Sequence, residues 1–123
     1  MDNKEEVLSL VEKTFEEAKA EMEKASSKNL DVEIDNNSTS QSVTLKVTQA
    51  ESHLFSCVLT PTECDREDSF FHNLAFILGE NHEEKTGRIR NHGEFIPKPG
   101  PALNDFLEGL RSLVLKTFDD TKN

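Results

Sequence analysis

The chain has 123 residues, 34% of them hydrophobic, and a formal net charge of -10 at pH 7. This length corresponds to a single α+β domain, residues 1–123, with a core that needs no disulfide or metal to hold it together. The negative charge excludes direct binding to nucleic acid or to an anionic membrane through a basic surface. It serves solubility, and it favours a more basic protein as partner. No cationic start followed by an apolar stretch and no membrane-spanning apolar run occurs, so we expect a cytoplasmic protein.

The first predicted element is a helix from about Asp2 to Ala25. Asp2 with Glu5 fits a capping box at its start. Apolar residues recur every three or four positions, which indicates one buried stripe. We expect this stripe to pack on a sheet. The alternative is that Phe15 and Met22 belong to a surface for a partner or a second copy, because such a helix, about 35 Å long, extends beyond a typical strand of about 17 Å.

Two runs in which apolar and polar residues alternate follow the helix, and each predicts a half-buried strand. The run 43–47 alternates valine and leucine with threonine and lysine. The run that begins at Leu30 places only carboxylates on its exposed face: Asp31, Glu33 and Asp35. A third strand is predicted from His53 to Thr60. Its apolar residues fall on both faces, which is typical of a strand that is central in its sheet or covered on both sides.

The segment 69–78 fits either a strand or a helix. As a helix it would form an apolar face and end at Gly79, which suits a helix C-terminus. As a strand it would place Phe70, Leu74, Phe76 and Leu78 on one face. We favour the strand because a helix would turn Phe76 toward its polar side. Residues 80–86 are then a polar connection, and the alternation from Arg88 to Ile96 predicts a fifth strand.

A second helix is predicted from Pro101 to Phe118, after a connector rich in proline. Pro101 suits the first helical turn, where no amide hydrogen is needed. The order of elements defines an α+β fold: an N-terminal helix, an antiparallel meander-like sheet of four to five strands, and a C-terminal helix packed on the sheet.

No pattern in the chain points to a catalytic residue, a metal site or a cofactor. The four histidines lack the spacing of metal ligands, and no nucleophile elbow, phosphate loop or dinucleotide fingerprint occurs. Cys57 and Cys64 are expected to be reduced thiols, with a bridge between them as the alternative. The acidic neighbours of Cys64 disfavour its thiolate. We therefore expect a protein that is not an enzyme.

One cationic cluster interrupts the acidic sequence. If residues 88–92 are extended, Arg88, Arg90 and His92 point the same way, and they form a candidate site for a carboxylate or phosphate. Two alternatives remain: the cluster pairs with the acidic strand face that begins at Asp31, or it is the charge that blocks an edge strand.

These observations lead to one main hypothesis about function. We expect a non-enzymatic interaction module (an adaptor, chaperone-like factor or inhibitor) that binds a more basic protein. Homodimerisation through a helix is a companion hypothesis. The alternatives are a domain, enzyme-like or not, that holds a small anionic ligand with Arg88 and Arg90, or an acidic mimic of nucleic acid.

Overall fold

The computed structural model describes residues 3–26, 29–64, 70–89, 92 and 95–122. Along the sequence, one long helix precedes all the strands and a second long helix follows them. The elements are α1 (Asn3–Ala25), β1 (Leu30–Asn37), β2 (Ser42–Gln49), β3 (Ser52–Glu63), β4 (Phe70–Leu78), β5 (Glu83–Thr86), β6 (Phe95–Ile96) and α2 (Pro101–Thr121).

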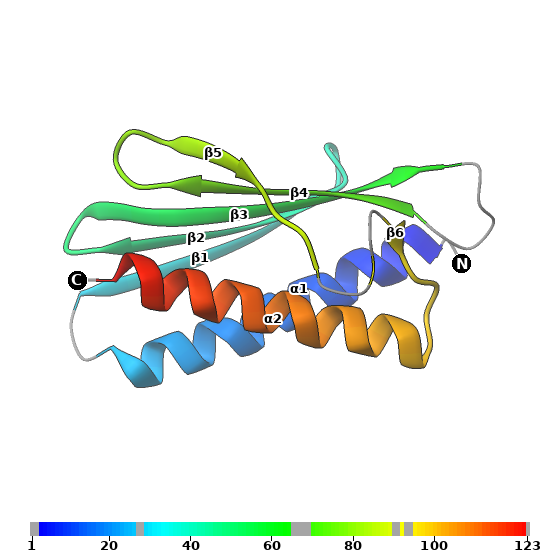
Figure 1. Ribbon diagram of the computed structural model, residues 1–123, viewed down its shortest axis with the longest axis horizontal. Helices are drawn as coiled ribbons and strands as arrows, with labels where there is room; N and C mark the ends of the chain where they lie inside the picture. The colour runs from blue at the N-terminus through cyan, green and yellow to red at the C-terminus, as the bar shows by residue number, and fades with distance from the viewer. Residues whose placement is uncertain (1–2, 27–28, 65–69, 90–91, 93–94, 123) are drawn as a thin grey trace.

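The strands form an antiparallel meander in the order β1-β2-β3-β4-β5, and β6 pairs with β4 outside this path. Both helices lie on the same face of the sheet and run in the same direction along it (Figure 1). The predicted fold class is therefore confirmed: an N-terminal helix, an antiparallel sheet and a C-terminal helix that packs on the sheet. In the described part of the chain no helix covers the opposite face, which we call the open face.

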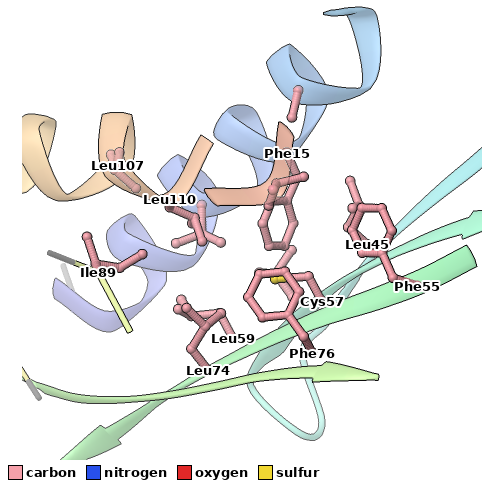
Figure 2. Packing of buried hydrophobic residues seen from close by; sticks show 14 of the residues in the cluster. Phe15, Leu45, Phe55, Cys57, Leu59, Leu74, Phe76, Ile89, Leu107 and Leu110 are labelled. Atoms are coloured by element: carbon pink, nitrogen blue, oxygen red, sulfur yellow. The ribbon is translucent and has the colours of Figure 1, made fainter. Parts of the chain in front are cut away.

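The stripe on α1 supplies one side of the hydrophobic core. Phe15 points from α1 toward the sheet, where Cys57 and Phe76 lie (Figure 2). Phe15 and Met22 each have 0% of their surface exposed. The hypothesis that these two side chains form an interaction surface is therefore wrong: β1 to β4 have 8 to 12 residues, more than a typical strand, so the core extends under both side chains.

The strand predicted for 69–78 is confirmed over its described residues, because Phe70–Leu78 forms β4 and pairs with β3 along its whole length. The central position of β3 also agrees with its apolar residues on both faces. Helix α2 begins at Pro101 as predicted and continues to Thr121, three residues beyond the predicted end.

The prediction for residues 80–96 is wrong in the described part of this segment. The strand β5 lies in Glu83–Thr86, where a polar connection was expected, and all of its side chains are exposed. Among the described residues of the predicted fifth strand, Phe95–Ile96 alone pairs, as β6. Ile89 instead leaves the sheet and is buried against α2 beside Gly109. An exposed strand has no buried face, so it gives no alternating pattern by which a sequence would reveal it.

Candidate functional site

The border of the sheet at β1 carries the acidic strand face. In the described part of the chain β1 pairs with β2 only, so its other edge is open. Val32 is buried in the core, and the three carboxylates that alternate with it are exposed on the open face: Asp31, Glu33 and Asp35. In the register of β1 with β2, Glu33 lies opposite Lys46. The other two carboxylates lie opposite threonines, so the row keeps a negative charge.

A hollow of about 600 Å³ lies at the start of this acidic row. It is bounded by β1, by Thr48 of β2 and by the turn that joins β2 to β3, and its lining includes two acidic residues, Asp31 and Glu51. Ala50 and Glu51 form this turn with φ angles of 51° and 67°. The backbone N–H of Ala50 donates to the carbonyl of Asn29 at 3.0 Å, which holds the turn against the chain that enters β1.

The positive φ angles matter because they are unfavourable for these side chains. Left-handed backbone conformations cost roughly 1–2 kcal/mol for residues other than glycine, asparagine and aspartate. Hairpin turns of this kind usually contain Asn-Gly or Asp-Gly. The sequence therefore gave no signal for a tight turn at this position, and the hollow was not predicted.

The predicted cationic face does not form among the described residues. Arg88 is exposed and lines a groove of about 430 Å³ over β3 and β4. His92 instead contacts α2: its Nε2 lies 2.8 Å from Oδ2 of Asp105, and its ring meets the ring of Phe106 edge-on. Arg90 lies outside the described residues. The reason for the separation is that Gly87 is the last residue after β5 that bonds to β4, and Arg88 and Ile89 are not part of a strand.

The groove beside Arg88 results from a gap in the outer edge of β4. Strand β5 pairs with Ala75–Leu78, the N–H of Gly87 donates to the carbonyl of Leu74 at 2.7 Å, and β6 pairs with Phe70 and Phe71. Residues 72 and 73 therefore lie between the two paired parts. Polar side chains line the groove next to Arg88, and one of them is a carboxylate; they are Thr60, His72, Asn73, Glu84 and Thr86. The groove thus combines both signs of charge with hydroxyl and amide groups.

Two other histidines form a cluster at the turn between β4 and β5. Nδ1 of His53 donates to the carbonyl of Gly79 at 2.8 Å, and its Nε2 lies 2.8 Å from Oγ of Ser56. The rings of His53 and His82 stack at 4.8 Å between centroids. Because both ring nitrogens of His53 have partners, this cluster fixes the turn. No group of three or more potential metal ligands occurs in the part of the chain that the structure describes.

The two cysteines are thiols, and they differ in burial. Cys57 is fully buried between the helices and the sheet, and this burial raises its pKa above the usual thiol range. Only a thiolate is a strong nucleophile, so Cys57 is poorly suited to catalysis. Cys64 is half-buried at the end of β3.

Comparisons with protein-family models, with curated proteins and with solved structures find no match for this chain. Neither α1 nor α2, the two helices that the structure describes, combines the length and the apolar character needed to cross a bilayer. Two candidate sites lie in the described part of the chain: the acidic border at β1 with its hollow, and the groove beside Arg88.

Proposed function

We propose that this protein is a non-enzymatic interaction module that binds a more basic protein through the β1 border. The observation that carries the proposal is the row of exposed carboxylates Asp31, Glu33 and Asp35 beside an open sheet edge. Charged residues of one sign along an accessible edge attract an oppositely charged partner and orient it. The net charge of -10 extends this attraction to long range.

The salt dependence of binding follows from the exposure of these carboxylates. The screening length falls from about 10 Å at 0.1 M salt to about 3 Å at 1 M. Contacts among exposed charges therefore weaken steeply in this range, whereas contacts between buried apolar groups do not. We expect a complex that forms at low salt and dissociates at high salt.

Affinity capture from native lysate, followed by mass spectrometry, tests this function. The wild-type chain is compared with the variant Asp31→Asn, Glu33→Gln, Asp35→Asn. The matched control is Glu6→Gln, Glu17→Gln, Glu108→Gln, which removes the same charge from exposed positions on the two helices.

We expect a basic protein to bind the wild-type chain and the control at low salt and to be lost with the β1 variant. Two results argue against the proposal. One is that no basic protein is recovered. The other is that both variants lose the partner equally, which would show that binding depends on net charge and not on the position of the β1 carboxylates. Light scattering at high concentration tests the companion hypothesis of a homodimer, and a monomer there removes it.

A second candidate function is the binding of a small anionic ligand in the groove beside Arg88. The observation in its favour is that Arg88 and His72 line the same groove. Glu84 on the same lining opposes an anion, so we place this function second. A thermal-shift screen of phosphates and carboxylates tests it. If a ligand raises the melting temperature of the Arg88→Ala variant as much as that of the wild-type chain, the ligand does not bind in this groove.

A further inference from the structure

We infer that β1 takes up an extended segment of the basic partner as an added antiparallel strand, and that this segment alternates apolar with basic residues. The inference rests on the proposed function and specifies its mode of binding. In this mode the backbone of the added strand hydrogen-bonds to the open edge, and alternate side chains determine which segments fit.

The edges of the sheet differ in how well they suit an added strand. β1 is eight residues long and in regular register with β2 from Leu30 to Asn37. Every second residue of such an edge directs its N–H and C=O groups away from the sheet. At the opposite edge β5 has only four residues, and β6 has two. Short edge strands of this kind commonly prevent pairing with another chain, and β1 is too long to be protected in this way.

The two faces of β1 specify the side chains of the added strand. On the helix side, Leu30 and Ile34 are only partly buried although they pack on the core. Apolar side chains from a neighbouring strand would cover their exposed surface. On the open face the three carboxylates would meet basic side chains, and opposite charges directly across a strand pair are stabilising. Alternation of apolar and basic residues therefore satisfies both faces at once.

The hollow at the start of β1 provides an additional place for a basic side chain. Its two acidic residues, Asp31 and Glu51, come from different elements. The unfavourable turn at Ala50 and Glu51 determines the position of Glu51. Unfavourable backbone conformations persist where the surrounding structure enforces them, and they are common at binding sites. In an added strand that runs along β1 toward Leu30, the basic residue that follows the one opposite Asp31 reaches this hollow.

A second copy of this chain does not fit the same edge. Antiparallel pairing of β1 with its own copy requires a two-fold axis perpendicular to the sheet, which keeps the open faces on the same side. Carboxylates would then lie opposite carboxylates along the whole pair, and like charges directly across a strand pair are destabilising. The occupant must therefore carry the opposite charge.

Hydrogen exchange with a defined peptide tests the inference. The probe is a nine-residue peptide of alternating lysine and valine, capped at both ends. The matched control peptide has the same composition, but its lysines and valines are in separate blocks. A second control carries an N-methyl group on every backbone amide, so neither of its edges can pair as a strand. We expect saturable binding of the alternating peptide and new protection of alternate β1 amides from exchange.

The control peptides separate strand addition from simple charge attraction. We expect about tenfold weaker binding of the block peptide and of the variant with Asp31→Asn, Glu33→Gln and Asp35→Asn. The N-methylated peptide should protect no β1 amide. Equal binding of all peptides, or protection that appears only outside β1, overturns strand addition.

The two proposals fail in different ways. If lysate capture depends on the β1 carboxylates while the alternating peptide protects no β1 amide, the proposed function stands and strand addition is wrong. If the peptide pairs with β1 but capture from lysate does not depend on these carboxylates, the edge accepts a strand and the proposed function is wrong.

Discussion

At the scale of single residues, the contact between Gly109 and Ile89 explains how the chain leaves the sheet. A Cβ atom at Gly109 would lie 2.8 Å from Cγ2 of Ile89, too close for an unstrained contact. The glycine therefore lets Ile89 pack directly on the backbone of α2, and this contact anchors the residues that follow β5 up to Ile89. A glycine inside a helix otherwise costs about 1 kcal/mol relative to alanine.

We expect Gly109→Ala to lower the free energy of unfolding by about 1 kcal/mol. Overpacking of roughly 1–3 kcal/mol outweighs the gain in helix propensity. In the background of Ile89→Ala the same substitution should become neutral or stabilising, because the clashing methyl group is gone. Denaturant unfolding of the four proteins measures this coupling. Stabilisation by Gly109→Ala in the wild-type background would contradict the packing described here.

The buried thiol of Cys57 predicts a dependence of stability on pH. Burial raises the pKa of this thiol in the folded state, so it stays protonated where the unfolded thiol, with a pKa of about 8.5, ionises. The stabilising contribution is therefore complete below about pH 8.5 and is lost as the pH rises, by up to about 1.4 kcal/mol per pH unit.

Urea unfolding between pH 8 and 10 measures this loss. We expect Cys57→Val to show a smaller decline than the wild-type chain, because valine is similar in size and does not ionise. Cys64→Ser is the control, since it leaves the buried thiol in place. Equal declines in all three proteins would show that Cys57 does not control the stability in this pH range.

At the scale of elements, the turn between β2 and β3 combines low intrinsic stability with a place in the proposed site. We expect Ala50→Asn with Glu51→Gly to raise the free energy of unfolding by about 1 kcal/mol, because both replacements tolerate positive φ. Thermal and denaturant unfolding measure the gain.

The same turn tests whether stability and binding oppose each other there. Glu51→Gln is the control: it keeps the unfavourable conformation and removes only the charge, so it should not stabilise the chain. We expect both changes at Glu51 to weaken binding of the alternating peptide. If neither does, Glu51 does not take part in the site.

The elements also show which sequence patterns were informative. The α1 stripe, the acidic alternation of β1 and the apolar run of β3 were predicted because each has a buried face that imposes a period. The strand β5 has no buried face, so its sequence resembles a loop. The gap beside Arg88 was not predicted either. It exists because β5 and β6 pair with different parts of β4, and no sequence pattern shows that pairing.

At the scale of the whole molecule, one hydrophobic cluster joins both helices to the sheet. We expect the chain to unfold in a single cooperative transition, and Phe15→Ala to cost about 3–5 kcal/mol. This is a large part of the roughly 5–15 kcal/mol typical of a domain. The single-domain prediction would be wrong if α1 unfolded before the sheet.

Far-UV circular dichroism and the NMR signals of buried methyl groups measure this transition. Intrinsic fluorescence of tryptophan or tyrosine is not an option, because the chain has neither residue. Coincident curves from the two methods support one cooperative unit. The exposed replacement Glu17→Gln serves as the control and should change the stability by less than about 0.5 kcal/mol.

The sequence by itself determined the class of fold, the two helices and the acidic face of β1. Each of these depends on local periodicity and charge, which are present in the order of residues. The tertiary structure decided which strand became the open edge and that Arg88 and His92 separate. These properties depend on the pairing of strands and the packing of helices far apart in the chain, which no local pattern encodes.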